Sequence, residues 1–248
     1  MEAYGSGPLQ RGEWWLPPGQ DGHDGRLPTV VLVHGGYWQP SYDRTLEDAV
    51  AADLAGRGFL VWNLDYAAAD ADWPSTLLDV AAGHDHLTRG RHAARVDPAR
   101  TAVVGHSAGG HLALWLASRR QLPPGAPGAG PAAPAPALAV GQAPVAALAQ
   151  GALEGLGDGA VVDLVGGAPD AVPERYRVSD PVALVPARVP TLLLHSDADA
   201  LVPVSQSEIY VAAAGPRARL VRVPGGHFAH LDPTSRALEE LHRALSGI

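Results

Sequence analysis

Short apolar runs that alternate with helix-like stretches constrain the fold of this 248-residue chain more than any other feature. Residues 29–33 (TVVLV) form a continuous apolar run rich in β-branched side chains, which is typical of a strand buried on both faces. Similar runs occur at residues 59–64, 101–104, 138–140, 191–194 and 219–223. Helices are predicted between them at residues 46–57, 74–89, 108–120, 205–214 and 233–245. The alternation predicts an α/β fold, with a mostly parallel central sheet and helices on both faces.

Two stretches interrupt this alternation. Residues 123–136 (PPGAPGAGPAAPAP) contain too much proline and glycine for a helix or strand and are predicted to form a flexible surface loop. Residues 150–189 are broken by glycine and proline and are predicted to form small helices that cap the open end of the sheet. Because the strand after the loop is needed for the same sheet, we expect a single domain over residues 1–248.

The composition excludes several classes of chemistry and partner. The chain has no cysteine, which rules out a thiol nucleophile, and all 18 basic residues are arginine, which rules out a Schiff-base lysine. The net charge of −8, with scattered arginines, argues against nucleic-acid binding. No apolar run approaches the roughly 18 residues of a membrane span. The first residues lack a basic segment followed by an apolar one, so we expect a cytoplasmic protein with no membrane partner.

The strongest chemical signal is the G-x-S-x-G motif at residues 105–109 (GHSAG). An apolar strand precedes it and a predicted helix follows, which is the context of a nucleophilic serine on a sharp strand-to-helix turn. Side chains two residues before or after Ser107 would clash in such a turn, so Gly105 and Gly109 are required. The turn places Ser107 at a helix N-terminus, where the helix dipole favours developing negative charge.

A serine hydroxyl needs a general base, and the base needs an orienting acid. With this kind of nucleophile the acid and then the histidine follow the serine along the chain. Residues 195–203 (HSDADALVP) follow one predicted strand, and His227 follows the next. We assign His227 as the general base, expect His230 on the surface, and leave Asp197 and Asp199 as alternatives for the acid.

The loop after the first buried strand is predicted to form an oxyanion hole. It reads HGGYW at residues 34–38, and its glycines allow backbone N–H groups to approach a tetrahedral intermediate closely. The expected donors are the amides of Gly36, with Gly35 or Tyr37 as alternatives, and of Ala108. The side chains expected around the substrate are those of Tyr37, Trp38, Tyr66, His106 and Phe228.

These motifs resemble those of the α/β-hydrolase superfamily over nearly the whole chain. The HGGYW loop is similar to the HGGxW motif of kynurenine formamidases (arylformamidases), as is the stretch GHSAGGHLA at residues 105–113. The resemblance implies that Ser107 is the nucleophile and His227 the base, and the pattern H-x-x-x-D-x-x-V-P selects Asp199 as the acid. It also implies cleavage of N-formylkynurenine to kynurenine and formate, without a cofactor or a metal.

Two alternatives stay open. Loops of the HGG-aromatic type also occur in general carboxylesterases, which cleave short acyl esters. A catalytically silent protein that binds a ligand through the same fold is an alternative of another class. In each case the expected partner is a small molecule, and the oligomeric state is undetermined, with a homodimer as one alternative.

Overall fold

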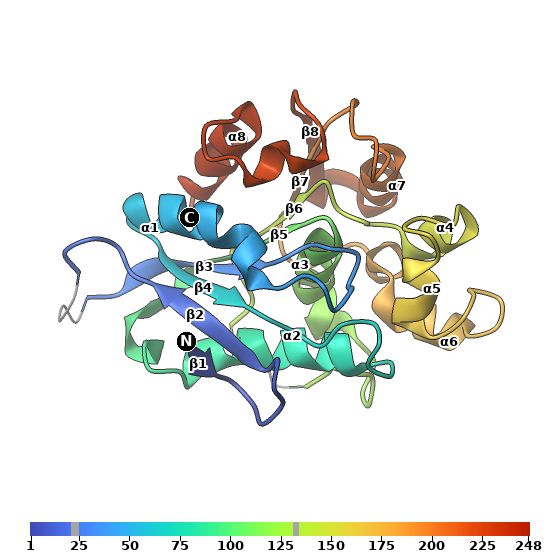
Figure 1. The fold of residues 1–248 in the computed structure, drawn as a ribbon, viewed down its shortest axis with the longest axis horizontal. Coiled ribbons are helices and arrows are strands. Elements are labelled where there is room, and N and C mark those ends of the chain that lie inside the picture. The colour runs from blue at the N-terminus through green and yellow to red at the C-terminus, as the bar shows by residue number, and fades with distance from the viewer. Residues whose placement is uncertain (21–24, 131–133) are drawn as a thin grey trace.

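A computed structural model describes residues 1–20, 25–130 and 134–248, and its centre is an eight-stranded sheet (Figure 1). The strand order is β1-β2-β4-β3-β5-β6-β7-β8, and the strands from β3 to β8 run parallel to one another. Their bounds are β1 Glu2–Ala3, β2 Arg11–Trp15, β3 Leu27–Val33, β4 Leu60–Leu64, β5 Val96–His106, β6 Leu138–Gln142, β7 Thr191–His195 and β8 Ala218–Arg222. The mostly parallel α/β architecture predicted from the apolar runs is therefore confirmed.

Helices cover both faces of this sheet. Successive residues of β3 point to opposite faces, so Val30 and Leu32 contact one hydrophobic cluster while Val31 and Val33 contact another. The first cluster includes α1 (Asp48–Gly56) and α8 (Arg236–Leu245), and the second includes α2 (Ser75–Asp85) and α3 (Ala108–Ser118). Burial on both faces explains why these strands are continuous apolar runs in the sequence.

The predicted helices are found with modest changes at their ends. Helix α7 spans Ser205–Ala214, as predicted. The predicted helix at 46–57 divides into a 3₁₀ turn, Arg44–Glu47, and α1. The helix predicted at 74–89 ends as α2 at Asp85 and continues only as a 3₁₀ turn, His86–Thr88. Strand β5 is longer than the run at 101–104 because it begins at Val96.

Strands β1 and β2 were not predicted from the sequence. They add to the edge of the sheet antiparallel, with β2 beside β4. The sequence of β2, RGEWW, lacks a continuous apolar run because an edge strand is only partly buried. Strand β4 is therefore paired with a segment whose own sequence does not predict a strand.

The segment over residues 150–189 forms small helices, as predicted. These are α4 (Leu148–Leu153), α5 (Ala160–Val165), α6 (Pro173–Ser179) and a 3₁₀ turn (Pro181–Leu184). They lie together at one end of the sheet, on the right of Figure 1. In the interrupted loop, the described residues 123–130 and 134–136 contain no helix or strand, and residues 131–133 lie outside the described part of the chain.

Candidate active site

Ser107 occupies the turn between β5 and α3. Its backbone angles are φ 57° and ψ −118°, a left-handed region that residues with a side chain rarely adopt. The turn is held by hydrogen bonds from the Ser107 N–H to the Gln142 carbonyl (2.8 Å) and from the His111 N–H to the Ser107 carbonyl (3.1 Å). A strained residue fixed in this way at a strand–helix junction is typical of a functional site.

The two motif glycines make this turn sterically feasible. A Cβ added to Gly109 would lie 1.9 Å from the Val33 carbonyl oxygen, and one added to Gly105 would lie 2.1 Å from the Gly109 carbonyl oxygen. Both distances involve backbone atoms that cannot move aside without disturbing the sheet. The prediction that side chains two residues either side of Ser107 would clash is therefore confirmed.

The HGGYW loop lies directly over this turn. A Cβ added to Gly35 would be 3.1 Å from the Ser107 Cβ atom, so only glycine lets the two backbones approach so closely. Gly36, Tyr37 and Trp38 then all have positive φ, at 103°, 50° and 55°. Left-handed conformations in two successive bulky residues are unusual, and the surrounding contacts must hold them.

The contacts that hold the loop come from three directions. The Tyr37 hydroxyl donates to the Leu201 carbonyl at 2.7 Å. The Trp38 carbonyl accepts from the Ala69 N–H at 2.7 Å, and the fully buried Trp38 ring meets His111 edge to face. Among the described residues, the N–H groups of Gly36 and Tyr37 have no hydrogen-bond acceptor, and the N–H of Ala108 in the first turn of α3 has no intrahelical one. These are the donors that the sequence predicts for an oxyanion hole.

His227 and Asp199 form a hydrogen-bonded pair just beyond the ends of β8 and β7. The His227 Nδ1–H donates to Asp199 Oδ2 at 2.7 Å, and the other carboxylate oxygen accepts the N–H groups of Leu201 and Val202, both at 2.9 Å. The Asp199 side chain is fully buried. Burial alone would raise the pKa of Asp199, but hydrogen bonds from His195, His227 and the Val202 N–H outweigh it and hold the pKa below its usual range.

Asp197, the alternative acid, has different surroundings. Its side chain is 66% exposed and forms an ion pair with Arg222, which is also paired with Glu208. The structure thus brings Asp199 and not Asp197 to the imidazole of His227.

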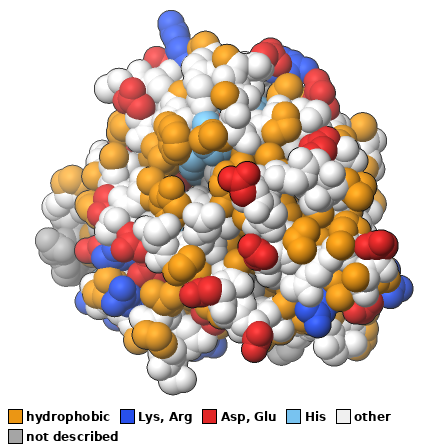
Figure 2. Space-filling view, turned by 45° about the vertical axis from the view of Figure 1, so that its right-hand side comes forward, with side chains coloured by type: hydrophobic (Ala, Val, Ile, Leu, Met, Phe, Trp, Pro, Cys, Tyr) orange, Lys and Arg blue, Asp and Glu red, His pale blue; other side chains and the backbone are white. Residues whose placement is uncertain are grey.

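Ser107 and His227 lie on neighbouring loops at the same edge of the sheet. The His106 Nε2–H donates to the His227 carbonyl at 3.0 Å, which ties the residue before the serine to the histidine loop. Ser107 Oγ is buried and has no hydrogen-bond partner among the described residues. Figure 2 shows histidine side chains at the bottom of a hollow whose rim carries hydrophobic and acidic groups.

Two of the residues expected to contact the substrate have supporting positions instead. Tyr66 is buried, stacks on His34 with ring centroids 4.2 Å apart, and donates from its hydroxyl to the His34 carbonyl. His106 is buried behind the turn. Burial, followed by the charges of His227 and His230, lowers the pKa of His106 far below its usual value. Both side chains are buried in the structure, where they pack against the HGGYW loop and the His227 loop.

The expectation for His230 is also wrong. The residue is fully buried, and both ring nitrogens lack partners among the described residues. Burial lowers its pKa to about 3, and the nearby His195 and His227 contribute to the same shift. Phe228, in contrast, is 60% exposed and meets the His227 ring edge to face, so it lies at the rim.

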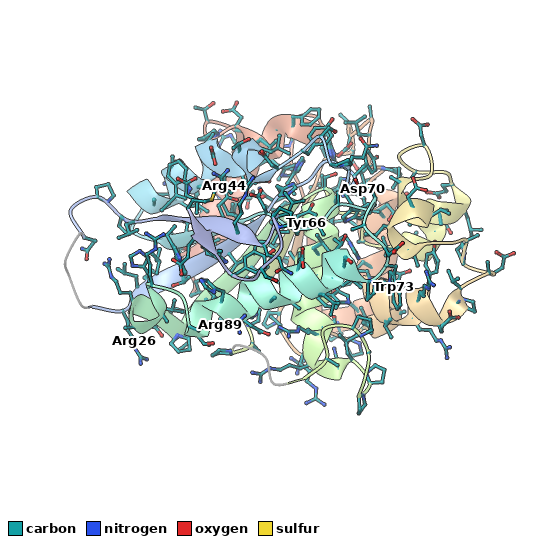
Figure 3. The ribbon with its side chains drawn as sticks, turned by 60° about the horizontal axis from the view of Figure 1, so that its bottom comes forward. Arg26, Arg44, Tyr66, Asp70, Trp73 and Arg89 are labelled. Atoms are coloured by element: carbon teal, nitrogen blue, oxygen red, sulfur yellow. The ribbon has the colours of Figure 1, made fainter. Side chains whose placement is uncertain are left out.

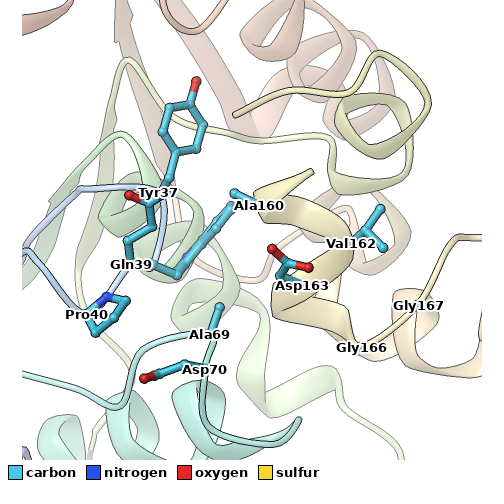
Figure 4. Close-up of a pocket in the computed structure, with 11 residues that line it drawn as sticks. Tyr37, Gln39, Pro40, Ala69, Asp70, Ala160, Val162, Asp163, Gly166 and Gly167 are labelled. Carbon is cyan, nitrogen blue, oxygen red and sulfur yellow. The ribbon is translucent and has the colours of Figure 1, made fainter. Parts of the chain in front are cut away.

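A cavity of about 510 Å³ lies between the HGGYW loop and α5. Tyr37 and the buried Trp38 border it on one side, and Asp70 and Asp163 contribute carboxylates (Figure 4). The Asp163 side chain extends from α5 toward the loop, whereas the Tyr37 ring points away from both carboxylates. Neither the Asp70 nor the Asp163 carboxylate has a hydrogen bond or ion pair with another described residue.

The segment after β4 lines one side of this cavity. It runs from Tyr66 in the interior past Asp70 to Trp73 (Figure 3). The Trp73 Nε1–H donates to Ser179 Oγ at 3.1 Å, and the Arg175 guanidinium lies 4.8 Å above the Trp73 ring. The only cation beside the cavity's carboxylates in this part of the described chain is thus already engaged with an aromatic ring.

Within residues 1–20, 25–130 and 134–248, no three His, Asp or Glu side chains are arranged to hold a metal ion. None of the helices in those ranges is long and apolar enough to cross a bilayer.

Comparison with known proteins places these features in context. Residues 15–123 match the BD-FAE family model. The chain is 33% identical over 110 residues to a probable isoprenylcysteine α-carbonyl methylesterase, ICMEL2, of Arabidopsis thaliana. The aligned region covers 44% of this chain and 25% of the relative. The chain is 33% identical over 107 residues to the carboxylesterase NlhH of Mycobacterium tuberculosis, covering 42% of this chain and 32% of the relative. The chain therefore matches about a quarter to a third of the length of these curated relatives.

The likeness to solved structures extends over almost the whole chain. A truncated carbohydrate esterase from gut microbiota superposes with a TM-score of 0.82 at 20% identity, covering 99% of this chain and 93% of that one. Esterase B from Lactobacillus rhamnosis gives 0.83 at 21% identity, covering 98% and 83%. The chain has the α/β-hydrolase fold. As expected for this fold, Ser107, Asp199 and His227 follow strands β5, β7 and β8 in that order.

One residue at the site was not singled out from the sequence. His195, the last residue of β7, is fully buried and has its Nε2 3.5 Å from Asp199 Oδ2. The signal that could have identified it is a histidine that ends a strand otherwise made of buried apolar residues, four positions before the acid. A histidine in such a place must have specific hydrogen-bond partners.

Proposed function

We propose that this chain is a serine esterase that hydrolyses a short acyl ester. The observation that carries the proposal is a strained serine at a helix N-terminus beside a buried carboxylate–imidazole pair. A serine in this turn can be activated only by a base, and His227 is the imidazole whose orientation a carboxylate already fixes.

In the proposed reaction, Ser107 Oγ attacks the ester carbonyl carbon and its proton passes to Nε2 of His227. The tetrahedral intermediate collapses as the carbon–oxygen bond to the alcohol breaks, and the alcohol leaves with that proton. Water then attacks the acyl-enzyme, giving its proton to His227, and the acid product is released as Ser107 regains the proton. Asp199 keeps the imidazole in the tautomer with hydrogen on Nδ1 and stabilises the imidazolium that forms twice in the cycle.

The unpaired N–H groups near Ser107 are the proposed oxyanion hole. The amide of Ala108 and an amide of Gly36 or Tyr37 would donate to the oxyanion of each tetrahedral intermediate. Loss of one fixed backbone donor of this kind typically lowers the rate by about 10²–10³-fold. The positive φ angles at residues 36–38 turn the N–H groups of the loop to directions in which they have no helix or sheet acceptor.

An aryl formamide is the second candidate substrate, favoured by the similarity of the HGGYW loop to that of kynurenine formamidases. The relatives and structural neighbours named above are esterases, which favours an ester. The unpaired carboxylates of Asp70 and Asp163 beside the cavity also disfavour a substrate with a net negative charge. Comparison of kcat/KM for p-nitrophenyl acetate, uncharged formanilide and N-formylkynurenine separates the three cases.

Substitution of the serine tests the proposal directly. The change Ser107→Ala should lower p-nitrophenyl acetate hydrolysis by about 10⁴-fold or more, because the nucleophile is removed. Ser118→Ala is the matched control: Ser118 is also buried, belongs to the same helix α3 and has no hydrogen-bond partner among the described residues. It should retain the parental rate.

Covalent labelling supplies an independent readout. A fluorophosphonate probe should label the parent protein and Ser118→Ala but not Ser107→Ala. If the folded parent neither reacts with the probe nor hydrolyses any of the three substrates, the proposal fails and a catalytically silent ligand-binding protein is favoured.

The expectations about the whole protein stay proposals. We propose a single domain with residues 150–189 as its cap, a small-molecule substrate and a cytoplasmic location. Size-exclusion chromatography with light scattering distinguishes a monomer from a homodimer, and cell fractionation tests the location.

A further inference from the structure

We infer that His195 is a positioning residue that holds the Asp199 carboxylate in place for His227. The inference rests on the proposed function, since it gives Asp199 the role of orienting acid. The residue is buried at the end of β7, has no path to a substrate, and acts only through its neighbours.

The hydrogen bonds of His195 form a chain toward the acid. Its Nδ1 lies 2.7 Å from Ser207 Oγ in the first turn of α7. Its Nε2 lies 2.9 Å from the Val202 carbonyl and 3.5 Å from Asp199 Oδ2. The same carboxylate oxygen is 2.7 Å from His227 Nδ1, so it lies between two imidazoles.

The partners determine which nitrogen carries the hydrogen. The Val202 carbonyl and the Asp199 carboxylate only accept hydrogen bonds, so a lone pair on Nε2 would face two acceptors. The Ser207 hydroxyl can donate. Nε2 of His195 therefore carries a hydrogen that it donates to the Val202 carbonyl, with Asp199 Oδ2 3.5 Å away, while Nδ1 accepts from Ser207.

This arrangement fixes the loop that carries Asp199, residues 196–202, to the end of strand β7. Val202 accepts from His195 through its carbonyl and donates through its N–H to Asp199 Oδ1. The carboxylate then has little freedom to rotate, because the Leu201 and Val202 amides hold one oxygen, His227 donates to the other, and the His195 ring lies 3.5 Å from that second oxygen. A fixed carboxylate keeps the His227 ring directed toward Ser107, and misplacement of about 1 Å can cost about 10²-fold in rate.

Several other ionisable groups surround this pair and must be included in any account of its pH dependence. On the side of the acid, the surrounding elements contribute His227 and His230 from the turn after β8, His106 from the end of β5, Tyr37 from the HGGYW loop, and Arg222, Asp197 and Glu208 around β8 and α7. Arg222, Asp197 and Glu208 pair with one another at the surface. The groups that respond to His195 are thus Asp199, the imidazole bonded to it, and His230.

The direction of the pH effect follows from the loss of one donor to the carboxylate. Without His195, Asp199 becomes more basic, since hydrogen bonds to the ionised form favour ionisation. A carboxylate that has lost one donor stabilises a cationic imidazole bonded to it more strongly. The acidic limb of the kcat/KM profile should therefore move upward in pH.

The experiment compares three variants of the full chain with p-nitrophenyl acetate as substrate. His195→Leu removes both hydrogen-bonding nitrogens and should lower kcat by about 10- to 100-fold with little change in KM. His195→Gln keeps an N–H donor at the end of the side chain and should recover a substantial part of kcat. Ser207→Ala leaves the imidazole in place and should cause a smaller loss, with the acidic limb shifted in the same direction.

A buried histidine away from the site serves as the control for folding. His84 in α2 is buried, and neither ring nitrogen has a hydrogen bond among the described residues. His84→Leu should keep the parental kcat and pH profile whatever its effect on the unfolding temperature. If His195→Leu does not fold, the comparison of His195→Gln and Ser207→Ala with the parent decides the question through the same pH profile.

The outcomes separate the inference from the function on which it depends. If the parent is inactive toward esters and unlabelled by a fluorophosphonate, the proposed function fails first. If the parent is active and the folded His195 variants keep its kcat and acidic limb, the positioning role is refuted. A loss that appears only in the unfolding temperature, with kcat and the pH profile unchanged, would show a purely structural role.

Discussion

Asp199 and Asp163 show how differently the two regions of this site are built. Asp199 lies at the buried edge of the sheet, where two backbone amides and two imidazoles surround its carboxylate. Asp163 lies on a six-residue helix beside the cavity, is exposed, and has no partner among the described residues. The same side chain is thus fixed by many contacts in one region and left free to meet a ligand in the other.

The comparison teaches that the proposed chemistry and the proposed selectivity depend on different kinds of structure. At the edge with Ser107 the backbone is packed so closely that a Cβ added to Gly105 or Gly109 would lie less than 2.2 Å from another backbone atom. This close packing makes the edge rigid. The cavity is enclosed by loops and short helices joined by glycines with positive φ, such as Gly159 and Gly166. Changes at the edge should therefore affect the rate for every substrate, and changes at the cavity should affect some substrates only.

The largest effect is expected from the buried carboxylate. Asp199→Asn should lower kcat by about 10⁴-fold, because an amide in this position no longer favours the reactive tautomer of His227. Asp197→Asn is the matched control, since Asp197 is largely exposed and paired only with Arg222. Steady-state kinetics with p-nitrophenyl acetate compares them, and equal losses in the two variants would contradict the assignment of the acid.

A second, intermediate effect concerns stability at the same buried edge. The pKa of His230 falls from its ordinary value of 6.5 to about 3 because of burial, so between these values the unfolded chain binds a proton that the folded chain does not. The free energy of unfolding should therefore decrease by about 1.4 kcal/mol for each pH unit as pH falls through this window. His230→Leu should remove that contribution, which urea unfolding at pH 7, 6 and 5 would measure.

The control for this slope is a change in the same turn that alters no ionisable group. Leu231→Ala should lower stability by a similar amount at each pH, because only apolar burial is lost. Parallel curves for His230→Leu and the parent would show that the unfolding free energy does not depend on protonation of His230.

The smallest effect is expected at the cavity. Asp163→Asn should raise kcat/KM for a carboxylate-bearing ester by up to about fivefold, since one charge at 4 Å in water contributes about 1 kcal/mol. The rate for the uncharged p-nitrophenyl acetate should be unchanged. The difference should decrease with added salt because exposed charges are screened. An equal change for charged and neutral esters would mean that Asp163 does not act through its charge.

The fold and the reactive edge were predictable because both depend on local sequence. Continuous apolar runs mark strands buried on both faces, and the GHSAG motif can follow such a strand only as a tight turn. Strands β1 and β2 were missed because an edge strand has no such run. The burial of Tyr66 and His106 was not predictable because sequence position places a residue near a loop but does not give the direction of its side chain.

The sequence by itself determined the α/β architecture, the turn that carries Ser107, and the glycines that the turn requires. The resemblance of the motif selected Asp199, and tertiary structure placed its carboxylate against His227 and brought His195 behind it. It also buried His230 and left Asp163 free beside the cavity. The physical reason is that backbone sterics act over a few neighbouring residues, whereas burial and hydrogen-bond partners depend on segments that meet only when the chain has folded.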